Sequence, residues 1–426
     1  MSDIRFEGWL HRSGTGGVYQ DSAGNVGIAS TQPQQKLDIG NGGFQVGPTG
    51  IATVTTVNTT NLVNSTPLSN RNYMVNGAMR VAQRGTGTFS GGTSTVRTVD
   101  NISSTVGGSY NFDVSMTQVT DAPHGFANAL KVVPDSTSTP SGSDNGILQM
   151  CIEGQDLQDF EFGTSGAKPI TVSFYAKSAS TNSGDTYSVQ IRHKSSSGTL
   201  LNYQVRGFTV TDSWQRFTFS FDGNQSKDIQ NNADLGFQIL WQLAVGPDDL
   251  ISATTSWVNA SGYRGLTGQN NFMDNTGNNF FVTGVQVELG SQATPFENRS
   301  FADELRRCQR YYFKFHPDDA GDTDSFCWAG KGAGSTGVDY NFILPCPLRA
   351  SPTINLDTSG GGNVRATTGT SGNGTSTTNP TVSGFNIHYP FICLRQLGFS
   401  GMSDNVVSMV SLSSTGVFIE FTAEIN

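Results

Sequence analysis

Residues 280–315 constrain the fold of this 426-residue chain more than any other segment, because an extended stretch there gives way to the one strong helix pattern. Within its first ten residues, Val285, Val287 and Leu289 alternate with polar residues, which is the period of a half-buried strand. After a Gly-Ser-Gln turn, Ser300 and Asp303 have the spacing of a helix capping box. One helical face is then predicted from Phe301, Leu305, Cys308 and Tyr312. The segment predicts a hinge between two β domains.

The composition is typical of an all-β protein. The chain has 51 Gly, only 14% charged residues and many Ser, Thr and Asn, which favours short strands joined by turns. Its length allows two or three domains. The formal charge of -9, with no basic run, argues against a nucleic-acid partner.

Three blocks are predicted, and the first covers residues 1–68. It has too few apolar residues for a globular core, yet Val26 and Ile28, then Leu37 and Ile39, alternate with other residues. That alternation has no purpose in a flexible linker, which is the alternative. It is useful if three chains bury one another's short strands, so a trimeric β stalk is expected.

The second block, residues 69–298, predicts a jelly roll or β-sandwich, because short strands recur between Gly, Asn and Ser turns. In two of these strands one face is apolar and is expected to form core. Those core faces are Val172, Phe174 and Ala176, and Phe217, Phe219 and Phe221. The strands are predicted at 112–119, 129–133, 147–152, 170–177, 186–193, 203–210, 214–221, 235–245 and 280–289.

The third block, residues 299–426, is predicted to be the capped helix followed by a β-sandwich module. Prolines in 343–354 suit an edge or turn, and 358–380 is Gly-, Ser- and Thr-rich, as in a long loop or mobile hairpin. Strands are expected at 384–388 and 406–412 and at the end of the chain.

Several motifs resemble tail fibre proteins of bacteriophages of the cyanophage or marine phage type. They include GNVGIAS with KLDI, NYMVNGAMRVAQRG, GVQVELG with ATPFENRS, and CQRYY. ITVSFYAKS and WQRFTFSF are similar to two strands of carbohydrate-binding-module jelly rolls. The resemblance covers nearly the whole chain and is weakest after Thr358.

That resemblance implies a homotrimer in a virion. Its first block would join other tail proteins, and its distal domains would bind a host surface polysaccharide or lipopolysaccharide. The chain has no signal-like start and no apolar stretch of about 20 residues, so we expect synthesis in the host cytoplasm and no membrane insertion. Release with the virus particle would then carry it outside.

No cofactor and no catalytic site are predicted. A glycosidase needs two carboxyl groups about 5–10 Å apart. The candidate pairs are Glu153 with Asp156, Glu161 with Asp159, and Asp248 with Asp249, and none lies in a catalytic motif. The alternatives to a receptor-binding fibre are a structural or capsid-decorating fibre and a polysaccharide depolymerase.

Two kinds of binding site are predicted. Aromatic and hydrogen-bonding side chains among turn residues favour a glycan site at Trp257, Tyr263, Arg264 and Trp328, although each Trp could instead plug the end of its own sandwich. An oxygen-rich loop favours calcium at Asp318, Asp319, Asp322 and Asp324, with a solvated acidic loop as the alternative.

The cysteines predict neither a zinc site nor a disulfide framework. Their number is odd and they show no C-x-x-C spacing, so buried reduced thiols are expected. The five are Cys151, Cys308, Cys327, Cys346 and Cys393.

Overall fold

The computed structural model divides into two compact units, Met1–Ser65 and Thr66–Asn426, and the predicted boundary at 298/299 lies inside the second. The predicted domain limits stay predictions. The residues that the structure describes are 8–10, 17–28, 37–39, 44–46, 52–54, 70–91, 95–195, 201–260, 262–315, 326–357, 364–368, 375–377, 381–388, 391–399, 402, 407–412 and 418–425.

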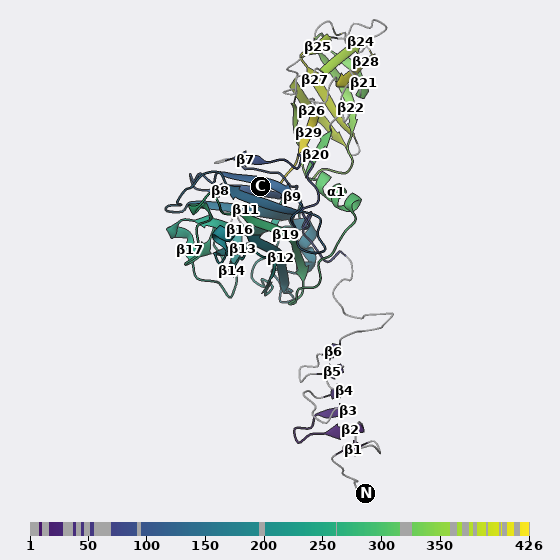
Figure 1. Ribbon diagram of the computed structural model, residues 1–426. Coiled ribbons are helices and arrows are strands. Elements are labelled where there is room, and N and C mark those ends of the chain that lie inside the picture. Colours follow the sequence, from purple (N-terminus) through teal and green to yellow (C-terminus); the bar gives the residue numbers. More distant parts are fainter. Residues whose placement is uncertain are drawn as a thin grey trace. The chain divides into compact units, whose positions relative to one another are not determined.

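In the first unit the described strands form one sheet in chain order (Figure 1). Val26 pairs with Leu37 and Ile28 with Ile39 in a parallel register, so the apolar positions of the sequence pattern are neighbours. Val18 and Ile28 are 41% and 39% exposed. The strands are β1 (Gly8–Leu10), β2 (Gly17–Gln20), β3 (Val26–Ile28), β4 (Leu37–Ile39), β5 (Phe44–Val46) and β6 (Ala52–Val54).

The second unit begins with a two-layer β-sandwich, and its first layer is a six-stranded sheet (Figure 1). Val172, Phe174 and Ala176 are fully buried in the core, as predicted. Phe217, Phe219 and Phe221 all lie on the edge strand, where Phe221 is buried and the other two are only partly buried. In spatial order the strands are β15 (Gln215–Phe221), β12 (Ile170–Ser178), β19 (Phe280–Leu289), β10 (Ala129–Pro134), β9 (Val114–Val119) and β7 (Phe89–Gly91).

The second layer is a five-stranded sheet whose apolar face completes the core. Trp241, Tyr187 and Phe237 are fully buried between the layers. The order is β14 (Leu201–Thr209), β13 (Thr186–Lys194), β16 (Leu235–Val245), β11 (Asn145–Glu153) and β8 (Ile102–Gly107). Short elements in the connections are η1 (Gly154–Phe160), η2 (Ser180–Asn182), η3 (Pro247–Asp249), η4 (Phe272–Asp274) and the parallel pair β17 (Leu250–Ile251) and β18 (Gly265–Leu266).

Strand β19 is buried on both faces, which corrects the half-buried strand expected from its alternation. Gln286 and Glu288 are 0% and 2% exposed. They are covered by the chain that follows, since Glu288 accepts hydrogen bonds from the amide and hydroxyl of Thr294. Polar residues on a strand therefore do not always face water.

Residues 70–84, here called the opening segment, lie along β19. The Gly77 carbonyl accepts the Val285 amide at 2.9 Å, and the Asn72 side-chain nitrogen donates to the Val285 carbonyl at 3.0 Å. A bulge at Gly284, where φ is +62°, lies beside Val285 in β19. A Cβ on Gly77 would lie 2.0 Å from the Val285 carbonyl oxygen, so glycine is required. Gly77 of the opening segment and Val285 of β19, which belong to two separate sequence motifs, are thus in direct contact.

The one α-helix among the described residues is α1 (Phe301–Gln309), at the predicted place. The Ser300 hydroxyl accepts the Asp303 amide at 3.2 Å and donates to the Asp303 carboxylate at 2.5 Å. The predicted face is partly wrong. Phe301 is 48% exposed, Tyr312 belongs to the next strand, and Glu304 and Cys308 are the buried residues of the helix.

Two further sheets follow α1 and enclose a separate apolar cluster (Figure 1). The segment predicted as a long loop or hairpin contains the antiparallel pair β24 (Val364–Thr368) and β25 (Thr375–Thr377). The three-stranded sheet is β20 (Tyr312–Phe315), β29 (Phe418–Thr422) and β23 (Thr353–Asp357). The seven-stranded sheet is β25 (Thr375–Thr377), β24 (Val364–Thr368), β28 (Val407–Leu412), β21 (Phe326–Ala333), β22 (Gly337–Ile343), β27 (Phe391–Leu397) and β26 (Thr381–His388).

No helix among the described residues is long and apolar enough to cross a membrane. Cys151, Cys308 and Cys346 are free and buried, as predicted, and Cys393 is free and half-buried. The side chain of Cys327 lies outside the described part of the chain.

Candidate functional site

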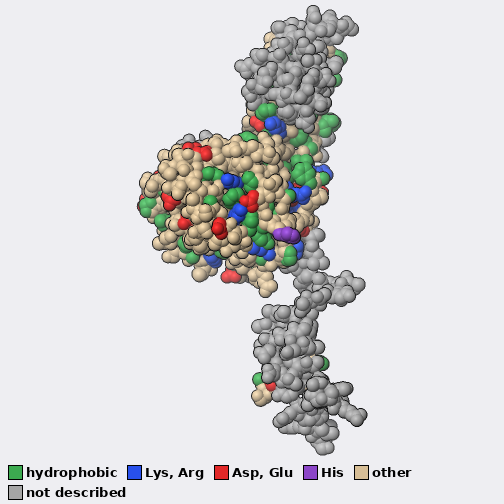
Figure 2. All heavy atoms as spheres, in the orientation of Figure 1, with side chains coloured by type: hydrophobic (Ala, Val, Ile, Leu, Met, Phe, Trp, Pro, Cys, Tyr) green, Lys and Arg blue, Asp and Glu red, His purple; other side chains and the backbone are tan. Residues whose placement is uncertain are grey.

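A groove of about 620 Å³ lies on the outer face of the five-stranded sheet. Because side chains alternate across a strand, Leu148, Met150, Ile239 and Val189 enter the core, whereas their sequence neighbours face outward. We call this hollow the Tyr263 groove. The face of the jelly roll that is visible in Figure 2 is mostly uncharged, with some charged and apolar side chains near its middle. Its lining residues are Thr95, Arg97, Thr105, Gln149, Arg192, Leu235, Gln238, Gly262 and Tyr263.

The floor of the groove is a chain of amide and guanidinium groups. The Arg192 guanidinium donates from Nε and Nη2 to Oε1 of Gln238, at 3.0 and 2.6 Å. The Gln238 amide in turn donates to Oε1 of Gln149 at 3.3 Å. Gln190 donates to the Gly262 carbonyl at 3.2 Å and accepts from Gln242 at 2.9 Å. These side chains come from three neighbouring strands and hold one another in fixed orientations.

Tyr263 supplies the aromatic surface of the groove. Its ring centroid lies 4.5 Å from the guanidinium carbon of Arg192, which is a cation–π contact. The ring also lies directly on the backbone at the end of β8. A Cβ on Gly107 would be 2.9 Å from Cδ2 of Tyr263, so a side chain at residue 107 would push the ring away.

Arg264 holds the loop that carries Tyr263. Its Nη1 is 2.5 Å from Oδ1 of Asp249 and 2.7 Å from the Tyr263 carbonyl oxygen. The other carboxylate oxygen of Asp249 accepts from Asn145 at 2.8 Å. Of the predicted glycan residues, Tyr263 therefore lines the groove and Arg264 positions it.

Trp257 and Trp328 lie elsewhere. Trp257 lines a separate depression of about 520 Å³, donates to the Asp222 carbonyl at 2.7 Å and packs edge-on against His193. Burial lowers the pKa of His193 to about 3, so this imidazole stays neutral. Trp328 packs among Phe315, Tyr340 and Phe342 in the C-terminal cluster. The structure does not bring the two tryptophans into the Tyr263 groove.

The remaining predicted site falls outside the structure that can be described. Asp318, Asp319, Asp322 and Asp324 all belong to residues 316–325, which are not among the described residues. Within the described part of the chain, no group of three or more His, Cys, Asp or Glu side chains could hold a metal ion.

Most carboxylates of the candidate hydrolytic pairs have other partners within the fold. Glu153 is bound to Arg310, Glu161 to Lys168 and Asp249 to Arg264. Asp159 accepts a hydrogen bond from the Tyr73 hydroxyl. Burial raises the pKa of Asp156, and the nearby Glu153 raises it further. Four of the six candidate carboxylates thus serve ion pairs or hydrogen bonds within the fold.

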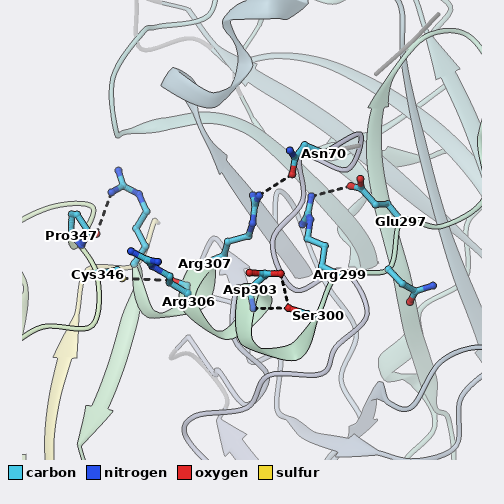
Figure 3. Close-up of a pocket in the computed structure, with 11 residues that line it drawn as sticks. Asn70, Glu297, Arg299, Ser300, Asp303, Arg306, Arg307, Cys346 and Pro347 are labelled. Carbon is cyan, nitrogen blue, oxygen red and sulfur yellow. Dashed lines mark hydrogen bonds and ion pairs between the residues drawn. The ribbon is translucent and has the colours of Figure 1, made fainter. Parts of the chain in front are cut away.

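A second depression, of about 710 Å³, lies beside α1 (Figure 3). Four arginines line it. Arg299 pairs with Glu297 at 3.3 Å, Arg307 donates to the Asn70 side chain at 3.2 Å, and Arg310 donates to the Pro347 carbonyl at 3.3 Å. Arg306 is exposed. These contacts connect α1 to the opening segment and to the C-terminal sheets.

Sequence reasoning missed the floor of the groove. Gln149, Gln190, Arg192 and Gln238 were the polar half of alternating strands, a pattern that predicts a solvated face. A detectable signal was the preference for Gln over Lys and Glu on those faces, since amides can be satisfied by one another when buried.

No protein-family model and no curated protein matches the chain. Among solved structures, the enzymatically active domain of bacteriophage CBA120 tailspike protein 4 is 14% identical, with a TM-score of 0.25. That match covers 45% of this chain and 19% of the tailspike chain, so the chain spans about a fifth of that protein.

The family 11 carbohydrate-binding module of Clostridium thermocellum cellulase Lic26A-Cel5E is 15% identical over 50% of this chain and 99% of the module, with a TM-score of 0.25. The CBM22-1 xylan-binding domain of Paenibacillus barcinonensis Xyn10C is 12% identical over 48% and 95%, again with a TM-score of 0.25. Likenesses of this strength do not assign a function to the chain.

Proposed function

We propose that the chain is a bacteriophage tail fibre, or another virion appendage, that binds a bacterial surface glycan in the Tyr263 groove. The observation that carries this proposal is the composition of the groove. An aromatic ring, several side-chain amides and a guanidinium converge on one open hollow of about 620 Å³. Sugars are bound by such combinations, because their apolar ring faces stack on aromatic side chains while their hydroxyls need donors and acceptors.

The side chains of the groove are also held in place before a ligand binds. Gln149, Gln238 and Arg192 stand on adjacent strands and are hydrogen-bonded to one another. Tyr263 is fixed by the Arg264–Asp249 ion pair. A preorganised site loses less conformational entropy when a ligand binds, so its affinity is higher.

The proposal includes no catalysis. Glu153 and Asp249 are committed to arginines, and the groove lining contains no Asp or Glu among the described residues. A polysaccharide depolymerase is the enzymatic alternative, and the release of reducing ends would reveal it.

We further propose that three chains associate through the first unit, which would also attach to the virion. The described strands there are three or four residues long, with Val18 and Ile28 about 40% exposed. Such strands gain little stability alone, and packing against sister chains would bury them. Three linked grooves would turn a weak glycan contact into strong adhesion.

The test is binding of the full chain to susceptible host cells. We expect saturable binding that protects the cells from infection and is lost when the surface polysaccharide is removed enzymatically. Absence of binding would favour a structural or capsid-decorating fibre. Mass photometry would test the trimer, and a purely monomeric protein would contradict it.

A further inference from the structure

Arg192 is a buried cation in the Tyr263 groove. The residue is 4% exposed, although it lines the groove. It donates hydrogen bonds to Oε1 of Gln238 and, at 3.5 Å, to the Gly262 carbonyl, and a hydrogen bond with the Tyr263 side chain favours its charged form. None of these partners is a carboxylate. A guanidinium has five N–H donors, and the Gln238 and Gly262 oxygens accept from three of them.

The surroundings do not neutralise this charge. Among the described residues that line the groove there are two arginines and no Asp or Glu. The other arginine, Arg97, is 3.2 Å from Glu424, but Arg84 lies 2.8 Å from the same carboxyl group. Burial lowers the pKa of Arg192, and the charged form still dominates because a guanidinium is a very weak acid.

Burying an uncompensated charge carries a large desolvation penalty, so a fold keeps one where the charge is useful or is paired. A structural role is the simpler alternative, with Arg192 merely ordering Gln238 and Tyr263. A glutamine or methionine could fill that volume without the electrostatic cost. The position of the charge, beneath an aromatic ring and inside an open groove, instead favours a ligand that brings its own negative charge.

We propose that the Tyr263 groove takes an acidic glycan and that Arg192 binds an anionic group of it, a sugar carboxylate or a sulfate. This inference rests on the proposed function. It adds the substrate class: the groove would prefer a uronic-acid or sulfated polymer to a neutral glucan or xylan.

The ligand test uses the full chain on immobilised polysaccharides. The neutral set is mixed-linkage glucan and xylan, the carboxylate set is polygalacturonate, alginate and hyaluronan, and chondroitin sulfate represents sulfate. Each acidic polymer that binds is compared with its carboxyl-reduced or desulfated form by calorimetry. We expect binding to acidic polymers to fall about 10- to 100-fold when the anionic group is removed.

The protein test uses a substitution that neutralises Arg192 in place. Gln238→Glu is nearly isosteric and would give the guanidinium an internal carboxylate, while the Gln149 amide can rotate to donate to it. We expect an unchanged or higher melting temperature and about 10- to 100-fold weaker binding of the acidic polymer. Arg306→Gln changes the net charge equally, lies outside the groove and is expected to bind normally. Arg192→Gln should reproduce the loss if it folds.

The outcomes separate the two proposals. Equal binding of neutral and acidic polymers, or normal acidic binding by Gln238→Glu, would overturn the acidic-glycan inference and leave glycan binding intact. Failure of every polymer and of host cells would remove the proposed function as well. A preference for chondroitin sulfate that survives carboxyl reduction would identify sulfate as the anionic group.

Discussion

Arg310 forms a two-pronged ion pair with Glu153, from Nε to Oε1 at 2.5 Å and from Nη2 to Oε2 at 2.7 Å. Glu153 is the last residue of β11 and is 0% exposed, whereas Arg310 directly follows α1. The hydrogen bond with Glu153 raises the pKa of Arg310, against the effect of its own burial. The pair therefore ties the hinge helix to the end of a central jelly-roll strand.

We expect Arg310→Met to lower the free energy of unfolding by about 3–5 kcal/mol, because it leaves a buried carboxylate unpaired. The measurement is urea unfolding followed by tryptophan fluorescence. Adding Glu153→Gln should restore most of the loss, since no charge is then stranded. As a control, Arg307→Gln on the exposed side of α1 should change stability by less than about 0.5 kcal/mol. A loss for Arg310→Met as small as the control's would contradict the prediction.

Asp100 should make stability fall as the pH rises through neutrality. Burial raises its pKa from 3.8 to about 7, although Gln83 and Arg84 oppose the shift. Because the pKa of Asp100 is higher in the folded state than in the unfolded state, the protonated carboxyl stabilises the fold. This contribution is fully present below about pH 3.8, the unfolded pKa, and is lost as the pH rises through about 7.

Between pH 6 and pH 8 the free energy of unfolding of the wild type should fall by on the order of 1 kcal/mol, whereas that of Asp100→Asn should not show this fall. The difference between the two chemical-denaturation profiles is the readout. His193 does not contribute to this difference, because its pKa of about 3 keeps the imidazole neutral throughout this pH range. Parallel profiles for the two proteins would show that Asp100 is ionised in the folded state at both pH values.

Gly77→Ala should destabilise the second unit by about 2 kcal/mol or more, because the new methyl group would meet the Val285 carbonyl at 2.0 Å. Thermal melting monitored by circular dichroism measures the effect. Gly87→Ala is the matched control, since nothing lies within 4 Å of a Cβ there. If both variants melt together, the opening segment is not held against β19 as described.

Tyr263→Ala should weaken glycan binding about tenfold or more without unfolding the protein, because the stacking surface over Arg192 is removed. Gly107→Ala should act in the same direction by displacing the ring. Trp257→Phe preserves the packing against His193 and should leave binding unchanged, since Trp257 lines another depression. Calorimetric titration with the best polymer of the panel gives the comparison. Normal affinity of Tyr263→Ala would place the glycan elsewhere.

Much of the fold was predictable because the strands of the jelly roll carry local signals. The predicted strand at 170–177 is β12 and that at 235–245 is β16, as β-branched and aromatic residues bounded by turns indicated. β8 was missed because its ISSTVG sequence has two adjacent serines and lacks clear alternation. Its place in the sheet depends on pairing with β11, about 40 residues later in the chain, a contact that no local window contains.

The site was less predictable than the fold. Tyr263 stood out as an aromatic residue among turn residues, but Gln149, Arg192 and Gln238 converge only through sheet pairing. Trp257 has the same local context as Tyr263, yet the fold places it against His193. Local context identified the type of residue in the site, and only the pairing of distant strands decided which of these residues meet.

The contacts around α1 limit where a chimaera of this chain can be joined. A chimaera joined at residue 299 would separate Asn76 from Glu304 and Glu153 from Arg310 at once. Joining at residue 312 would keep both pairs, although Arg84 and Arg97 would still need an acidic group at the place of Glu424. A chimaera that replaces the C-terminal sheets should therefore leave the helix with the jelly roll and supply a carboxylate in the place of Glu424.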